Sequence, residues 1–163
     1  MDNIGFKRFT NFDLPLLRNI PVHKIEKQKA LNFQHIPEIP NNSFSFSTAS
    51  WQKSDRYLYA IDLFNFGYYW EVHEVLEKIW LEIGKTSITG IFIQGIIQLS
   101  VAMVKKIELN SNGVARMRAK AIPKLQSQEG IFLGIEIENL IAQFESFINA
   151  EIATEPFIQL HFD

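Results

Sequence analysis

Apolar residues recur every three or four positions through most of the chain after residue 54. The pattern covers residues 55–66, 68–83, 88–109, 113–127 and 135–150, and this spacing predicts five helices. Short polar or glycine-containing segments separate them, so consecutive helices should pack side by side and antiparallel. The chain carries no strand-like alternation of useful length. We therefore predict an all-α fold, an antiparallel bundle of about five helices.

Residues with capping chemistry mark the predicted helix ends. Ser54 is the expected N-cap of the first helix, and Thr86 or Ser87 that of the third, because a hydroxyl can accept a hydrogen bond from a free backbone N–H. Gly67 can adopt a positive φ after the first helix. Pro123 should kink the fourth helix.

Residues 1–50 differ from the rest of the chain in composition. They hold four of the six prolines and six of the 14 phenylalanines. Proline breaks long helices, whereas disordered segments are poor in aromatic residues. We predict an irregular, proline-rich N-terminal arm over 1–50 that packs on a helical body over 51–150, with a tail over 151–163. Within the arm, residues 20–32 are a candidate short helix and 41–43 a turn.

Composition narrows the class of protein. The 163 residues are 47% hydrophobic, enough for one domain with its own core. Cysteine is absent, which removes thiolate chemistry, and a net charge of -2 argues against nucleic-acid binding. The longest apolar stretch, 88–104, contains glutamines and glycines and is too short for a membrane span. We expect a cytoplasmic protein, and the 13% aromatic content leaves a homo-oligomer open.

The predicted second helix concentrates aromatic and ionisable side chains on one face. At about 100° per residue, five of them fall within an arc of about 120°. Two tryptophans are unusual on a helix face that contacts only solvent, and two glutamates are unusual on a face that packs only in the core. The pattern therefore indicates a lined pocket or a polar network. The five residues are Trp70, His73, Glu74, Glu77 and Trp80, with Glu71, Val75 and Lys78 on the opposite side.

The predicted third helix supplies polar partners for this face. Gln94, Gln98 and Lys105 fall on one stripe of about 60° on an otherwise apolar helix. Buried amide and ammonium groups need hydrogen-bonding partners. The first interpretation is a buried polar network in a scaffold or interaction module, in which Glu74 or Glu77 pairs with Lys105.

A metal site is the second interpretation of the same face. His73 and Glu77, one turn apart, can bind one divalent ion such as zinc, iron or manganese, and Glu74 stands where a general base would activate water. The protein would then be a metal-dependent hydrolase. No third protein ligand is evident, although His23 or His35 could come from the arm.

A ligand pocket is the third interpretation. Trp70, Trp80 and Tyr69 could form aromatic walls around a small molecule or peptide. Separately, Arg116 and Lys120 lie four residues apart on the predicted fourth helix and could contact an anion. These patterns do not decide between an enzyme and a binding protein, and they leave the substrate or partner open.

Three sequence blocks between residues 57 and 126 together resemble the sequence pattern of a known protein family. They are Phe64-Asn65-x-Gly67-x-Tyr69-x-Glu71-x-His73-Glu74-x-Leu76-Glu77-x-x-Trp80, the run 90–98 followed by Ala102, and Asn110-x-x-Gly113-Val114-Ala115-Arg116. Together they resemble the bacterial and archaeal family catalogued as domain of unknown function 309, whose members are sometimes labelled predicted metal-dependent hydrolases. The resemblance implies an all-helical fold. Leu109 departs from the family pattern, which has glycine before the asparagine.

Overall fold

A computed structural model describes residues 7–16, 18, 36–39, 45–150 and 154–163 of the chain. Five α-helices occupy most of these residues, so the predicted all-α class is confirmed. A short 3-10 helix precedes the five, and a small hairpin separates the last two. The elements in chain order are η2 (Trp51–Lys53), α1 (Asp55–Asn65), α2 (Tyr69–Ile83), α3 (Ile88–Ile107), α4 (Ser111–Leu125), β1 (Ile131–Phe132), β2 (Ile135–Glu136) and α5 (Ile137–Asn149).

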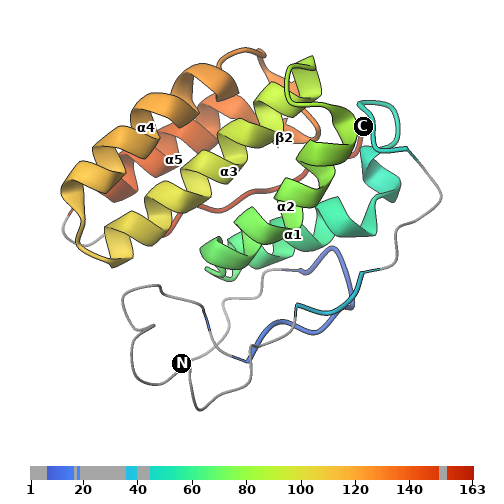
Figure 1. Cartoon of the computed structure of the whole chain (residues 1–163), viewed down its shortest axis with the longest axis horizontal. Coiled ribbons are helices and arrows are strands. Elements are labelled where there is room, and N and C mark those ends of the chain that lie inside the picture. Colours follow the sequence, from blue (N-terminus) through green and yellow to red (C-terminus); the bar gives the residue numbers. More distant parts are fainter. Residues whose placement is uncertain (1–6, 17, 19–35, 40–44, 151–153) are drawn as a thin grey trace.

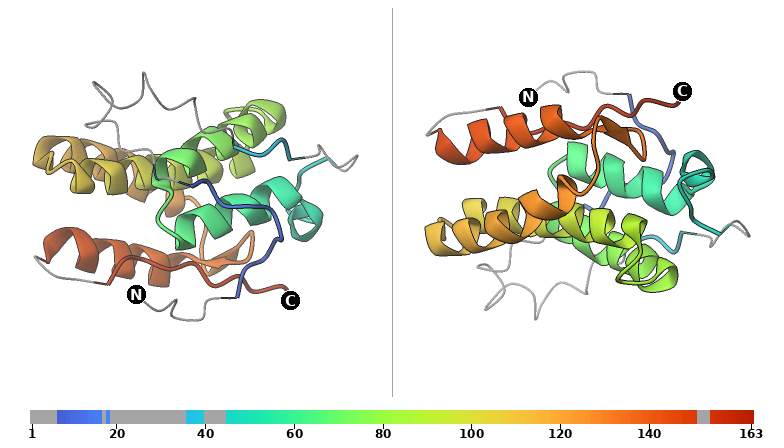
Figure 2. Two further views of the ribbon diagram at one scale, coloured as in Figure 1. Left: turned by 90° about the horizontal axis from the view of Figure 1, so that it is seen from below. Right: turned by 90° about the horizontal axis from the view of Figure 1, so that it is seen from above.

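The helices form two layers (Figures 1 and 2). α2, α3 and α4 make one layer with α3 in the middle, and α1 and α5 make the other. Consecutive helices from α1 to α4 pack directly on one another, as their short connecting loops predict. α3 is thus covered on both flanks and on the side that faces the second layer.

The core lies between the two layers. Every residue of α1 from Tyr57 to Phe64 is buried. Gly95 lets α3 approach α4 closely, because a Cβ atom there would lie 3.0 Å from Cδ2 of Leu125. Among the described residues, α3 is the one helix long and apolar enough to cross a membrane, and 61% of its apolar window is buried inside the fold. That burial is typical of a core helix.

The helix ends follow the predicted capping chemistry. Oγ of Ser54 accepts a hydrogen bond from the Tyr57 backbone N–H at 3.2 Å. Oγ of Ser87 accepts one from the Gly90 N–H at 2.9 Å, so Ser87 rather than Thr86 caps α3. Gly67 follows α1 with a φ of 77°, the left-handed conformation that glycine adopts without strain.

A short hairpin at residues 131–136 is the one β-sheet among the described elements, and the sequence pattern did not predict it. β1 pairs antiparallel with β2, and the turn residues Leu133 and Gly134 have φ values of 50° and 77°, as in a tight hairpin turn. Two residues per strand are too few for alternation to be visible in the sequence. α5 consequently begins at Ile137 rather than at residue 135.

Two side-chain amides hold the C-terminal segment between α1 and α5. Asn65 donates to the carbonyl of Ile158 at 2.8 Å and accepts from its N–H at 2.7 Å. Gln143 makes the same pair of bonds with Phe157, at 3.2 Å and 2.8 Å. Each amide therefore pairs with the backbone as a neighbouring strand would. Leu160 then bridges to β2.

The described part of the arm lies against α1. The backbone N–H groups of Phe9 and Thr10 donate to the Asp62 carboxylate at 2.7 Å and 2.9 Å, and the Thr10 hydroxyl donates at 2.6 Å. Further along, the Tyr59 hydroxyl donates to the carbonyl of Asp13 at 2.7 Å. Backbone and side-chain bonds thus fix residues 9–13 on the first helix.

Several predicted features fall outside the described residues. These are the candidate helix at 20–32, the turn at 41–43, and the histidines His23 and His35. The division into arm, body and tail stays a prediction.

Candidate functional site

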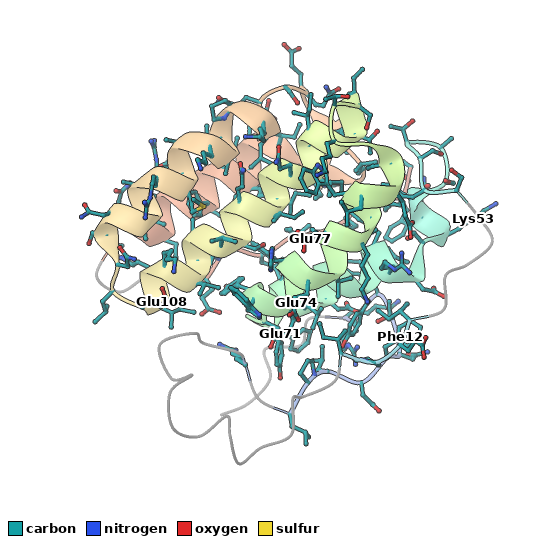
Figure 3. The ribbon with its side chains drawn as sticks, viewed as in Figure 1. Phe12, Lys53, Glu71, Glu74, Glu77 and Glu108 are labelled. Carbon is teal, nitrogen blue, oxygen red and sulfur yellow. The ribbon has the colours of Figure 1, made fainter. Side chains whose placement is uncertain are left out.

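The outer face of α2 carries two exposed carboxylates beside half-buried rings. Glu74 and Glu77 are exposed, whereas Trp70, His73 and Trp80 are half-buried. Figure 3 shows the two glutamates following one another along α2. Solvent therefore reaches this face, and the prediction that its glutamates belong to a buried network is wrong.

His73 lies between an indole and a carboxylate. Its ring centroid is 5.1 Å from that of Trp70, and its Nε2 is 3.9 Å from Oε2 of Glu77. That distance is longer than a hydrogen bond. The side chains of His73 and Glu77 are 26% and 48% exposed, so an approaching molecule can reach both.

On the outer face of α2 and on α3, three buried polar atoms have no hydrogen-bond partner among the described residues. They are Nδ1 of His73, Nε1 of Trp80 and Oε1 of Gln98. Because α2 and α3 run antiparallel from the loop at 84–87, Gln98 lies near the level of His73 on the neighbouring helix. Buried polar atoms are normally satisfied, so a bound molecule or water is expected to contact them.

Lys105 pairs with a residue of its own turn. Its Nζ donates to Oε2 of Glu108 at 2.7 Å, and Glu108 lies beyond the last residue of α3, away from the α2–α3 loop (Figure 3). The predicted pairing of Lys105 with Glu74 or Glu77 is therefore wrong. Glu108 follows Lys105 by three residues, so the lysine side chain reaches it without crossing the helix interface. Gln94, the other glutamine of the stripe, is half-buried.

The aromatic pocket is not formed as predicted. Tyr69 is only 2% exposed, and its ring packs edge-on against Phe64 with the centroids 5.4 Å apart. Burial, followed by the nearby charge of Glu155, raises the pKa of the Tyr69 phenol. Tyr69 is thus a core residue, and the half-buried indoles of Trp70 and Trp80 face the surface without it.

The side of α2 opposite this face contains acidic chemistry that the sequence prediction missed. Glu71 on α2 and Asp62 on α1 are each 1% exposed. Burial and the charges of these carboxylates raise the pKa of Tyr59 to about 12, against an opposing effect of Arg8. A single aspartate within a run of buried apolar residues on α1 was the available signal, because a buried carboxylate requires a partner.

The described residues do not complete a metal centre. Within them, no three His, Cys, Asp or Glu side chains converge, and a catalytic zinc site uses three protein ligands. His73 and Glu77 supply two. The divalent metal therefore stays a prediction, with no third ligand assigned.

The predicted anion contact on α4 also stays a prediction. Arg116 and Lys120 are both exposed. Between them, Arg118 forms an ion pair with Glu145 of α5, with Nη2 and Oε1 2.6 Å apart. That pair joins the two layers across the surface of the bundle.

Comparison with known proteins places the site within a family segment. Residues 57–117 match the family described as Domain of unknown function (DUF309), which confirms the resemblance over this segment. The match contains every candidate site residue on α2 and α3, and Arg116 on α4. Lys120 lies beyond its end. No curated protein and no solved structure matches the chain.

Proposed function

We propose that this chain is an interaction module that binds another protein through its α2–α3 face. The observation that carries the proposal is the exposed carboxylate pair of Glu74 and Glu77 beside two half-buried indoles. The α2–α3 face consists of Trp70, His73, Glu74, Glu77, Trp80, Gln94 and Gln98.

The residue types of this face suit protein recognition. Tryptophan is enriched among the residues that dominate binding energy at protein interfaces. Trp70 and Trp80 are half-buried in the free chain and would lose their remaining exposed surface on contact. The buried Nε1 of Trp80 and Oε1 of Gln98 would gain hydrogen-bond partners from the bound protein.

The charge of the face indicates a basic partner surface. Among the described residues, neither Glu74 nor Glu77 forms an ion pair with a lysine or arginine. Complementary charge across an interface orients the partner and speeds association. A protein surface or segment that carries lysine or arginine is therefore the expected partner.

A photo-cross-linking amino acid tests the location of the interface. It is placed in the full chain at position 77 on the α2–α3 face, or at the exposed position 142 on α5 as a matched control. We expect a defined cross-linked protein from position 77 only.

The charge reversals Glu74→Lys and Glu77→Lys should then weaken binding of the purified partner about tenfold or more. Identical products from both positions, or unchanged affinity, would contradict the proposal.

A metal-dependent hydrolase is the second candidate function. The convergence of His73 Nε2 and Glu77 Oε2 at 3.9 Å favours it, with Glu74 as the residue available to act as a base. A thermal shift on addition of zinc, iron or manganese that disappears in His73→Ala would support this candidate.

A small-molecule pocket at the two indoles is the remaining alternative. For all three, we expect the protein in the cytoplasm, which cell fractionation tests.

A further inference from the structure

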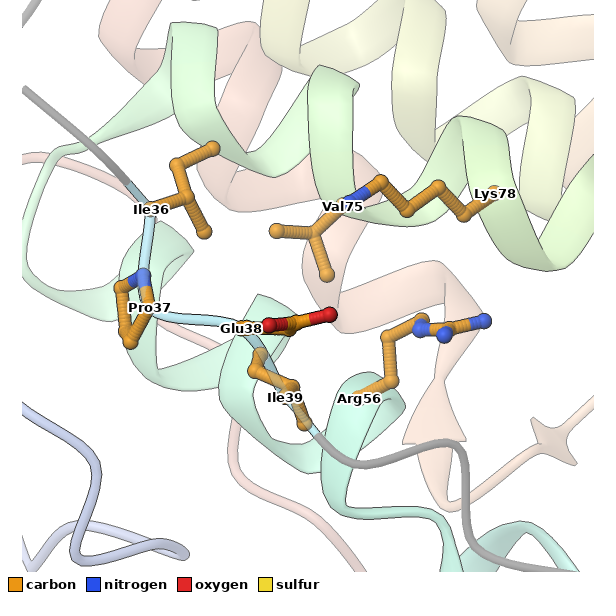
Figure 4. A pocket seen from close by; sticks show the side chains of 7 residues that line it. All are labelled: Ile36, Pro37, Glu38, Ile39, Arg56, Val75 and Lys78. Carbon is orange, nitrogen blue, oxygen red and sulfur yellow. The ribbon is translucent and has the colours of Figure 1, made fainter.

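A separate cavity lies between the arm and the first two helices (Figure 4). Its volume is about 400 Å³, within the usual range for small-molecule sites. Arm residues 36–39 form one wall, Arg56 of α1 another, and Val75 and Lys78 of α2 the third. Val75 lies on the opposite side of α2 from Glu77, and Lys78 lies between the two sides, one turn after Glu74, so the cavity opens beside the α2–α3 face and not on it.

Opposite charges line this cavity without neutralising one another. Figure 4 shows the Glu38 side chain directed from the arm toward the space in front of Arg56 and Val75. No ion pair joins Glu38 to Arg56 or Lys78 within the described residues; Arg56 instead contacts Glu82, with its Nη1 2.8 Å from Oε1. The cavity therefore presents a carboxylate and an ammonium group that are both free to bind a ligand.

The remaining lining is apolar. Ile39 and Val75 are 8% and 2% exposed, and Ile36 packs against the core cluster. These side chains form a hydrophobic wall next to the charged groups. An apolar wall with a few convergent polar groups is the usual composition of a ligand site.

We propose that this cavity binds a free amino acid with an apolar side chain. The Glu38 carboxylate would accept hydrogen bonds from the ligand's ammonium group. Lys78, with the remaining donors of Arg56, would bind its carboxylate. Its side chain would lie against Ile36 and Val75. A free amino acid carries an ammonium group and a carboxylate on the same carbon atom. It can therefore bridge the opposite charges of the cavity, which among the described residues form no ion pair with each other.

Leucine is the test ligand, and two blocked forms are its controls. N-acetyl-leucine lacks the ammonium group and leucinamide lacks the carboxylate. We expect saturable binding of leucine to the full chain by calorimetry, and binding at least about tenfold weaker for each blocked form, since each loses one charge-assisted contact.

Variants assign the contacts. Glu38→Gln should weaken leucine binding about tenfold and leave N-acetyl-leucine binding unchanged, because that ligand has no ammonium group. Lys78→Gln should also weaken leucine binding about tenfold, and it should leave leucinamide binding unchanged, because that ligand has no carboxylate. Both residues are exposed, so the fold should be retained. Glu138→Gln, which changes an exposed glutamate on α5, is the matched control and should bind leucine normally. Absence of saturable leucine binding, equal binding of the blocked forms, or a matching loss in the control would overturn the proposal.

Discussion

The carboxylate of Asp62 accepts a hydrogen bond from the Thr10 hydroxyl at 2.6 Å across 52 positions of sequence. The same carboxylate also accepts the backbone N–H groups of Phe9 and Thr10. Nε of Arg8 lies 3.7 Å from it. One buried side chain of α1 therefore satisfies three donors of the arm, and this contact fixes where the arm enters the body.

Asp62→Ala should destabilise the protein by about 2–4 kcal/mol, because it leaves buried donors of the arm without an acceptor. Chemical denaturation measures this loss, and limited chymotrypsin digestion should cut faster after Phe9 and Phe12. Glu74→Ala removes an exposed carboxylate and should change stability by less than about 0.5 kcal/mol. Equal effects of the two substitutions would contradict the role assigned to Asp62.

The amide of Asn65 should protect one particular backbone N–H in the C-terminal segment. Asn65→Ala removes both bonds to Ile158, so the Ile158 amide should exchange faster with solvent deuterium, by about tenfold for a loss near 1.4 kcal/mol. Gln143→Ala is the matched control, since it removes the bonds to Phe157 and should chiefly affect that amide. Loss of protection along the entire segment in both variants would instead indicate that the segment detaches as a unit.

Leu109→Gly should stabilise the protein. Leu109 has a φ of 56°, and the bonds from Leu109 N to Lys106 O and from Asn110 N to Lys105 O close a Schellman turn after α3. A leucine in this conformation costs about 1 kcal/mol, and its side chain is 89% exposed, so little packing is lost. We expect a gain of about 0.5–1 kcal/mol in thermal or denaturant unfolding.

Leu133→Gly tests the reason for that gain. Leu133 has a similar φ of 50° but is only 3% exposed. Glycine there relieves the same strain but removes a buried side chain, which costs about 2–5 kcal/mol. The two substitutions should therefore change stability in opposite directions, and the same sign for both would show that backbone strain is not the deciding effect.

Alkaline pH should destabilise the fold through its buried tyrosines. Burial raises the pKa of Tyr59 from 10.0 to about 12 and also raises that of Tyr57. The unfolded chain therefore ionises first, so the stability that Tyr59 contributes is complete below pH 10 and is lost as the pH rises toward 12. The free energy of unfolding should fall by up to about 1.4 kcal/mol per pH unit for each such tyrosine.

Denaturant titrations at pH 8 and pH 11 measure this fall, and ultraviolet absorbance follows phenolate formation. Tyr59→Phe should have a shallower pH dependence because one ionisable ring is gone. A flat stability across this range, or ionisation of all four tyrosines of the folded chain near pH 10, would contradict the account.

The fold was predictable from the sequence because its signals are local. Apolar spacing located all five helices, and hydroxyl caps such as Ser54 and Ser87 act within three residues of themselves. The departure noted at Leu109 also had a structural counterpart, since that residue adopts the conformation that glycine would favour. The hairpin at 131–136 was missed because its strands have two residues each.

The site was less predictable because it depends on which segments cover each face of α2. Helical spacing correctly grouped His73, Glu74 and Glu77 on one side, but it could not say which side faces solvent. Glu71 is buried and Glu74 exposed. Asp62 was missed for the same reason, since its partners lie about 50 residues earlier in the arm.

The central claim is that His73 and Glu77 are recognition residues of the α2–α3 face and not ligands of a resident metal. Elemental analysis of the full chain, purified without chelator or nickel resin, tests it most directly. Our account predicts no stoichiometric zinc, iron or manganese, and identical metal content in His73→Ala. Close to one metal ion per chain, lost in His73→Ala, would contradict it and would place the hydrolase first.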